Sequence, residues 1–307
     1  MIVKRTYYLI EKVIRNLNGT TNNLNYDKKI YSSEEGNNII SQLLISDKPF
    51  MVSRYGSTEL TIINHYEKFK YKKQIFWKAD MIRNLREVSG VFPENEIILK
   101  KFSKLYLECS RDIDLLGVWF KPGENFIVNT YCKLAKLTKL EGLEPYFFDQ
   151  PWSRLLKDKR VLVIHPFQDS ITHQYNSKRT LLFPDTEVLP SFSLFTLKAT
   201  QSIANNQTRF SNWFEALEFM YQQIDKFDFD VAIIGAGAYG LPLASYIKRK
   251  GRKAIHLGGA TQILFGIKGR RWDQREEFSA LYNENWKRPF TSEHPIDAHI
   301  VEEGCYW

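Results

Sequence analysis

The sequence contains few cysteines and no long apolar run, and both absences narrow the class of protein. Its three cysteines, Cys109, Cys132 and Cys305, lie far apart and form neither a metal-binding pair nor a disulfide framework. We therefore expect a reducing compartment. No apolar stretch reaches the length that crosses a bilayer. Charged residues interrupt the apolar positions of the N-terminus, which is not typical of a secretory signal. These absences predict a cytoplasmic protein.

Metal-ligand patterns are also missing, whereas positive charge and aromatic residues are plentiful. None of the six histidines stands near acids or cysteines at the spacing of a structural metal site. The 307 residues are 43% hydrophobic and 14% aromatic, which suffices for a packed core and argues against a disordered chain. A net charge of +8 favours anionic partners, namely nucleotide phosphates, a negatively charged membrane surface or nucleic acid.

The stretch from Asp230 to Gly259 is the strongest structural signal in the chain. It begins with an apolar run, Val231 to Ile234, that is typical of a strand buried on both faces. A glycine turn and an amphipathic helix follow, and basic residues with Gly251 end the helix. Lys253 to Leu257 predicts a second strand. The pattern therefore predicts one strand–helix–strand unit of a parallel sheet.

The glycine turn of this unit has three interpretations. Gly235, Gly237 and Gly240 would let backbone N–H groups at the helix start approach an anionic ligand. A dinucleotide site would require an acidic residue about 20 residues further on. The second strand instead ends in His256-Leu257-Gly258-Gly259. We therefore favour a nucleoside diphosphate over a dinucleotide, and a purely structural turn is the third interpretation.

The remaining periodicities divide the chain into an appendage, residues 1–26, and one α/β domain, residues 27–307. Residues 1–17 carry a basic amphipathic stripe, typical of a helix that packs on the domain, on a partner subunit or on a membrane. In the domain we expect a Rossmann-like, largely parallel sheet flanked by helices. We predict strands at 49–53, 114–120 and 160–166, extended pieces at 145–148 and 187–189, and helices at 35–46, 97–109, 129–140, 212–224 and 262–267.

Polar residues gather where the expected strands end. The four turns concerned are Arg54–Glu59, His165–Asp169, Gly235–Gly240 and His256–Gly259. Because the carboxyl ends of parallel strands meet at one edge of a sheet, we expect a common crevice. Its arginines, together with Arg270 and Arg271 of a basic loop, would stabilise a leaving diphosphate. A carboxylate or histidine would deprotonate an acceptor hydroxyl.

Each candidate side chain also has a purely structural interpretation. Glu59 fits an acid that the dipole at a helix start favours. Asp169 fits a turn residue that bonds its own backbone, and His165 fits a histidine of the core. Arg270 and Arg271 fit solvated surface residues.

Two segments together resemble the bacterial glycosyltransferases of the GT-D fold. Those proteins carry R-[FY]-G-D-G-E after an N-terminal strand, and a later glycine turn, helix and strand that end in a glycine-containing loop. The matching segments are RYGSTE (54–59) and IIGAGAYGLPLASYIKRKGRKAIHLGG (233–259). The resemblance implies a cytoplasmic enzyme of cell-surface polysaccharide biosynthesis. Such an enzyme moves a sugar from a nucleotide-sugar donor to a glycan or lipid-linked glycan acceptor.

The resemblance also bears on metal binding. In that family an Asp-x-Glu pair of the first motif serves nucleotide and divalent-metal binding. Only Glu59 carries over, because Ser57 occupies the aspartate position. Serine is a poor ligand for Mg²⁺ or Mn²⁺. A divalent metal, and a metal-binding role for Glu59, therefore stay open.

Residues and resemblance together predict a nucleotide-sugar-dependent glycosyltransferase. Glu59, Asp169 and His165 are the predicted catalytic residues, with Asp169 or His165 as the general base. The predicted donor site comprises Arg54, Tyr55, Gly56, Ser57, Gly235, Gly237, Tyr239, Gly240, His256, Gly258, Gly259, Arg270 and Arg271.

Three other functions remain as alternatives. They are an NAD(P)-dependent oxidoreductase, a non-catalytic nucleotide- or glycan-binding protein, and a nucleic-acid binder that would use the basic, aromatic stretch 68–88. We expect neither NAD nor nucleic acid as a partner. Contact with the inner face of the membrane and homo-oligomer formation stay open.

Overall fold

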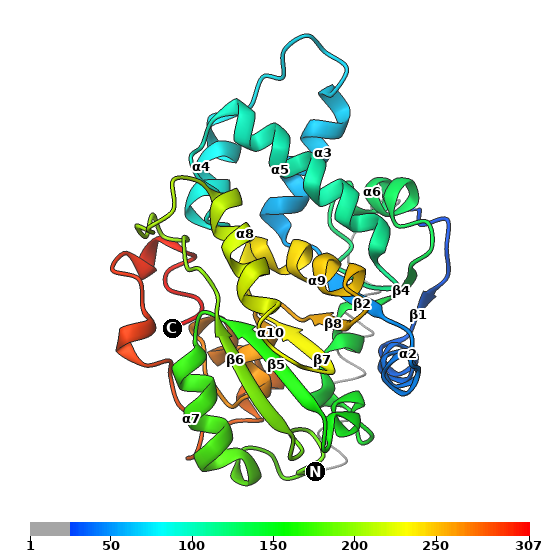
Figure 1. Ribbon diagram of the computed structural model, residues 1–307, viewed down its shortest axis with the longest axis vertical. Coiled ribbons are helices and arrows are strands. Elements are labelled where there is room, and N and C mark those ends of the chain that lie inside the picture. The colour runs from blue at the N-terminus through cyan, green and yellow to red at the C-terminus, as the bar shows by residue number, and fades with distance from the viewer. Residues whose placement is uncertain (1–24) are drawn as a thin grey trace.

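The structure is a computed structural model that describes residues 25–307, and its centre is an eight-stranded sheet (Figure 1). The strand order is β1-β4-β3-β2-β8-β7-β5-β6, and all neighbouring strands pair in parallel. This confirms the predicted α/β class with a parallel sheet flanked by helices. The strands are β1 (Ile30–Tyr31), β2 (Phe50–Arg54), β3 (Leu115–Val118), β4 (Lys136–Lys139), β5 (Arg160–His165), β6 (Ser193–Lys198), β7 (Val231–Ile234) and β8 (Lys253–His256).

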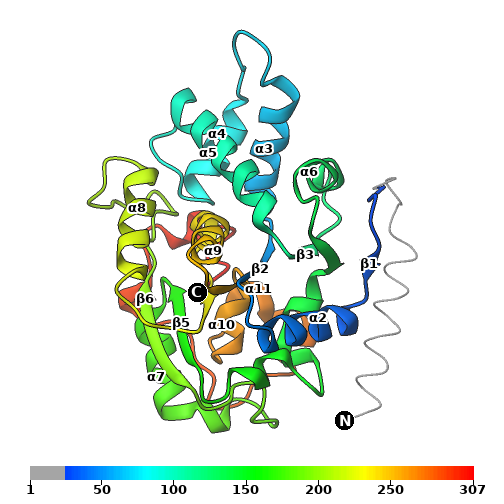
Figure 2. The same ribbon diagram turned by 45° about the vertical axis from the view of Figure 1, so that its right-hand side comes forward.

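Helices cover both faces of the sheet, because successive strand residues point to opposite sides. In β2, Met51 packs with one layer, whereas Phe50 and Val52 pack with the other. The first layer holds α3 (Ser57–Phe69), α4 (Ala79–Glu87), α5 (Glu96–Cys109), α6 (Glu124–Tyr131), α8 (Trp213–Ile224) and α9 (Gly240–Arg249). The second layer holds α2 (Ser33–Ile45), α7 (Gln168–Lys178) and α10 (Ala260–Leu264). Figure 2 shows α9 and α10 on opposite sides of the sheet.

The order in which the chain adds strands to the sheet changes direction beside β2, although every strand is parallel to its neighbours. After β2 the chain moves outward to β3 and β4, whereas β5 to β8 fill the other side. In open parallel sheets, ligands bind at the carboxyl ends of the strands next to such a reversal. The topology therefore directs attention to the ends of β2, β8 and β7.

The strand–helix–strand unit forms as its sequence predicts. β7 and β8 pair in parallel with Val231 opposite Lys253, and α9 connects them. Gly251 follows α9 with a φ of +80°, a left-handed conformation that glycine adopts without steric cost. At the start of α8, the Asn212 side chain accepts the N–H groups of Phe214 and Glu215, as expected for a helix cap.

Several local predictions are wrong. Residues 129–140 do not form one helix, because α6 ends at Tyr131 and β4 begins at Lys136. Pairing with β3 and complete burial of Leu137 override the helical pattern there. Residues 187–189 lie in a turn, and the strand starts at Ser193 instead; the piece 145–148 contains a 3₁₀ turn. The helix expected at 262–267 is α10, which begins and ends earlier. The helix expected at 1–17 lies outside the described residues.

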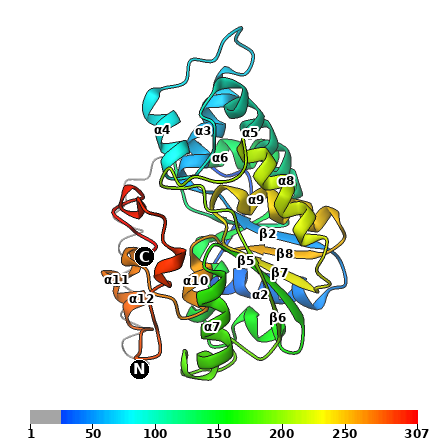
Figure 3. The same cartoon turned by 60° about the vertical axis from the view of Figure 1, so that its left-hand side comes forward.

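The C-terminal segment packs beside the second layer through short helical pieces. α11 (Arg270–Asp273) and α12 (Glu276–Ser279) follow α10. The backbone N–H groups of Arg270 and Arg271 donate to the carbonyls of Trp307 and Cys305. Figure 3 shows the last part of this segment, in red, next to α11, in orange. None of the helices described between residues 25 and 307 combines the length and the apolar character of a bilayer span.

Trp213 tests how strongly the first layer depends on aromatic packing. It is fully buried, stacks on Tyr239 with ring centroids 4.7 Å apart, and meets Phe102 edge-on. We expect Trp213→Ala to lower the free energy of unfolding by about 3–5 kcal/mol, because a cavity replaces the ring. Urea unfolding measures this loss. The control Phe126→Ala removes a half-exposed ring and should change the same quantity by no more than about 0.5 kcal/mol. Equal losses in the two variants would contradict the conclusion that the packing of Trp213 stabilises the first layer.

Candidate active site

The four strand-end turns meet at one cavity beyond the carboxyl ends of β2, β5, β7 and β8. The cavity has a volume of about 580 Å³. Of the sequence-predicted residues, it is lined by Arg54, Gly56, Ser57, Glu59, His165, Gly235, Gly237, Tyr239, His256, Gly258, Gly259 and Arg271. The parallel sheet thus brings together residues from both halves of the chain.

The half-buried guanidinium of Arg54 places a positive charge in the wall of this cavity. Its Nε and Nη2 donate to the backbone carbonyl of Tyr55 at 3.1 and 3.0 Å. Its Cζ lies 3.8 Å from the centroid of the Trp119 ring, a cation–π contact. Within residues 25–307, no carboxylate forms an ion pair with it. Burial lowers the pKa of Arg54 to about 10, so the group stays charged at neutral pH without a paired counter-ion.

Two helix starts add positive potential to the same cavity. α3 begins after Gly56 without a side-chain cap, and so does the 3₁₀ turn Gly237–Tyr239 that leads into α9. Gly237 has a φ of +52°, which favours glycine. At Gly235 a Cβ would lie only 2.5 Å from Cδ2 of His165. The free N–H groups at such helix starts attract anions.

The helix start after β5 is closed by a carboxylate of the protein itself. Glu293 accepts the backbone N–H groups of Asp169 and Ser170 at 2.8 and 3.3 Å, and its other oxygen accepts the Ser170 hydroxyl. Glu293 is buried and so occupies the anion position at the start of α7. Asp169 is exposed and does not line the cavity. Its position therefore gives no support to the predicted role as general base.

The hydrogen bonding of His165 makes it a donor rather than a base. Its Nδ1 accepts the backbone N–H of Phe167 at 3.0 Å, so the neutral ring carries its proton on Nε2. Burial lowers the pKa of His165 to about 3. The ring is therefore neutral and has no free lone pair for a proton. In His256, burial and then the charge of Arg54 lower the pKa to about 3, and Nδ1 lies 3.0 Å from the Ser53 hydroxyl.

Glu59 is a buried carboxylate in the wall of this cavity. It is 7% exposed, and its side chain folds back over Gly56 at the start of α3. Burial raises the pKa of Glu59, whereas hydrogen bonds from its own backbone N–H and from the Ser89 side chain, and then the positive charge of Arg54, oppose that rise. A carboxylate with a raised pKa is a better proton acceptor than an ordinary surface acid.

Ligands for a hard divalent cation do not converge at this cavity in the described residues. Mg²⁺ and Mn²⁺ prefer several oxygen ligands, usually including carboxylates. Ser57 stands two positions before Glu59, and the Arg54 guanidinium repels a cation. No group of three or more His, Cys, Asp and Glu side chains converges anywhere in the described part of the chain. Cationic side chains and helix starts are the groups available to neutralise a phosphate.

Three of the predicted donor-site residues do not line the cavity. The Tyr55 hydroxyl is buried in the core and donates to Ser110, whereas its carbonyl holds Arg54. Gly240 lies beneath the His256 ring, which leaves no room for a Cβ. Arg270 is exposed and faces Glu303.

Several lining residues escaped sequence reasoning. Trp119 directly follows β3, and Arg54 is the last residue of β2, so the strand-end rule would have found Trp119 as well. Tyr306 and Trp307 come from a tail without periodicity, and no sequence signal pointed to them. The other polar or aromatic lining residues include Ser89, Tyr106, Lys121, Glu144, Gln201, Ser202, Gln262, Trp272, Arg275 and Glu302.

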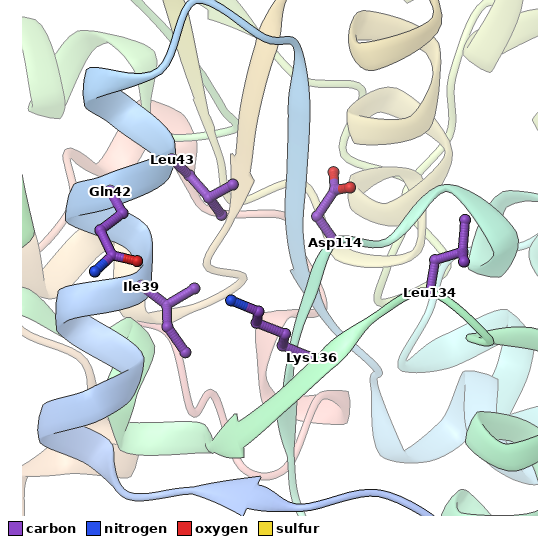
Figure 4. Close-up of a pocket in the computed structure, with 6 residues that line it drawn as sticks. All are labelled: Ile39, Gln42, Leu43, Asp114, Leu134 and Lys136. Carbon is purple, nitrogen blue, oxygen red and sulfur yellow. The ribbon is translucent and has the colours of Figure 1, made fainter.

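A smaller hollow of about 270 Å³ lies at the opposite edge of the sheet, between α2 and the starts of β3 and β4. Its lining residues are Ile39, Gln42, Leu43, Asp114, Leu134 and Lys136 (Figure 4). Asp114 already accepts the N–H of Met51 and pairs with Lys248. Because its carboxylate is engaged, we assign the candidate site to the larger cavity.

No family model and no curated protein matches this chain. Among solved structures, it is similar to a selenomethionine-substituted structure of domain of unknown function 1792 (TM-score 0.47, 11% identity, covering 87% of this chain and 93% of that chain). It is also similar to a structure described as showing that this highly conserved domain has a distinct glycosyltransferase fold (TM-score 0.46, 12% identity, the same coverage). At such low identity, function has to be argued from the cavity.

The neutral histidines predict a pH dependence of stability. The pKa of His165 falls from 6.5 to about 3 on folding, so the unfolded chain binds the extra proton between these values. Above pH 6.5 neither state binds this proton, so His165 does not affect the free energy of unfolding. Below pH 6.5 only the unfolded chain binds it, so the free energy of unfolding falls as the pH falls toward 3. We expect His165→Asn, whose amide oxygen can accept the Phe167 N–H, to flatten the decline by about 1.4 kcal/mol per pH unit. Urea unfolding of both proteins between about pH 4 and 6 measures the slope, and parallel slopes would refute a neutral buried His165.

Proposed function

We propose that this cavity binds a nucleoside diphosphate sugar and that the protein transfers the sugar to an acceptor hydroxyl. The observation that carries the proposal is the half-buried, charged Arg54 guanidinium, which forms no ion pair within residues 25–307 and lies in the same cavity as the start of α3 and the 3₁₀ turn that leads into α9. A diphosphate supplies the negative charge that these groups lack. The volume of about 580 Å³ is in the range of pockets that enclose ligands of this size.

The reaction follows from the placement of charge. The acceptor oxygen attacks the anomeric carbon, the bond from that carbon to the diphosphate oxygen breaks, and the nucleoside diphosphate leaves. Arg54 and the helix starts of α3 and α9 stabilise the negative charge that grows on the leaving group. Glu59, whose pKa is raised by burial, takes the proton of the acceptor hydroxyl.

Two further groups have defined tasks in this proposal. His165 donates a hydrogen bond from Nε2 to the donor and moves no proton. Arg271 is a second positive charge in the wall of the cavity. Because Arg271 pairs with Glu302 and lies over the Tyr306 ring, it contributes less net charge than Arg54.

The adjacent arginines Arg271 and Arg270 provide a matched test of binding. Arg271 lines the cavity and Arg270 does not. We expect a nucleoside diphosphate and its sugar to raise the melting temperature of the wild type, since they bind the folded state. Arg54→Gln should abolish this rise, Arg271→Ala should reduce it, and Arg270→Ala should leave it intact. A rise with NAD(P) alone, or an equal response of all variants, would contradict the proposal.

Glu59 and Asp169 give a second matched pair, this time for catalysis. The measurement is release of nucleoside diphosphate from the stabilising donor, with and without candidate acceptors. Glu59→Gln should lower the rate by about 10²–10⁴, the usual share of a general base. Asp169→Asn should leave it within about twofold, because Asp169 lies outside the cavity. A fully active, folded Glu59→Gln protein would exclude this carboxylate as the base.

A further inference from the structure

The loop between α3 and α4 is the most strongly basic and aromatic exposed segment outside the cavity. We define the basic tip as residues 68–78. It contains five lysines and no acid: Lys68, Lys70, Lys72, Lys73 and Lys78. In Figures 1, 2 and 3 this loop projects at the end of the long axis, beyond the helices of the first layer.

Two aromatic side chains of the basic tip point into solvent. Tyr71 is 92% exposed and Phe76 is 83% exposed. Their neighbours show that the loop is anchored, since Ile75 and Trp77 are buried on either side of Phe76. The Phe76 carbonyl lies 2.8 Å from Nε2 of His65 on α3. The backbone is therefore anchored where it carries Phe76.

The charge of the basic tip is mostly uncompensated. Lys70 is neutralised, because it pairs with Glu67 at 2.9 Å. The other four lysines have no ion pair with any residue in the range 25–307. Lys68 and Lys72 lie over the Phe69 ring at 5.4 Å, so their charges stay near the aromatic side chains.

We propose that the basic tip docks the protein on an anionic membrane surface. Lysines next to a bilayer are attracted by acidic headgroups, and aromatic rings prefer the interface between headgroups and acyl chains. A projecting loop can insert Tyr71 and Phe76 while its lysines stay at headgroup level. Single-stranded nucleic acid fits less well, because its bases stack on aromatic platforms within a charged groove. This inference is independent of the proposed transferase activity.

The test is sedimentation of the full chain with vesicles. We use phosphatidylcholine alone and phosphatidylcholine with about 30% phosphatidylglycerol, at low and high salt. The full chain should bind the anionic vesicles, and binding should weaken with salt. Lys72→Ala/Lys73→Ala should weaken it about 25-fold, from about fivefold per lysine. Tyr71→Ser/Phe76→Ser should weaken the binding that remains at high salt by about tenfold.

The control removes the same charge elsewhere. Lys48 and Lys157 are exposed and precede β2 and β5, at the edge of the sheet opposite the cavity. Lys48→Ala/Lys157→Ala should therefore bind like the wild type. All variants should unfold at the wild-type urea midpoint, because only exposed side chains change.

Three results would overturn the proposal. The first is absence of binding to the anionic vesicles. The second is equal binding by the wild type and the basic-tip variants, which would assign membrane contact to another part of the chain. The third is tip-dependent binding of a fluorescent single-stranded oligonucleotide without vesicle binding, which would assign the surface to nucleic acid.

Discussion

The parallel pairing of β2 with β8 is the contact on which the cavity depends. Met51 lies opposite Ala254 and Val52 opposite Ile255. At the end of these strands, Ser53 and His256 meet at 3.0 Å. The first half of the chain supplies the half-buried Arg54 guanidinium and the start of α3, and the second half supplies the glycine turns and the start of α9. The cavity therefore needs both halves of the chain.

The charged groups of the cavity differ in whether they already have a partner of opposite charge. Arg54 is positioned by a carbonyl and an aromatic ring, which leave its charge available. Arg271 is paired, and the start of α7 is filled by Glu293. Of these two arginines, Arg54 is therefore the one without an ion pair inside residues 25–307, and it shares the cavity with the starts of α3 and α9. The aromatic residues of the C-terminal segment form another part of the wall, which suits an uncharged part of a ligand.

Sequence reasoning succeeded where one local pattern decided the structure. The apolar runs of β2, β5 and β7 predict buried strands, and parallel pairing then predicts that their end turns meet. It failed where distant contacts decide. Residues 136–139 become a strand because β3 lies beside them. Asp169 follows a strand as predicted but lies outside the expected common cavity, and Glu293, far away in sequence, accepts its backbone N–H. Tyr306 reaches the cavity from a segment whose sequence has no regular pattern.

The same pairing has a consequence for synthesis of the protein. Residues paired across β2 and β8 are about 200 positions apart, as the Ser53–His256 contact shows. Translation at about 5–20 residues per second separates their emergence by about 10–40 s. During that interval one edge of the apolar strand β2 has no final partner. Exposed strand edges of this kind recruit chaperones and favour aggregation, so yield of folded protein should depend on the rate of translation.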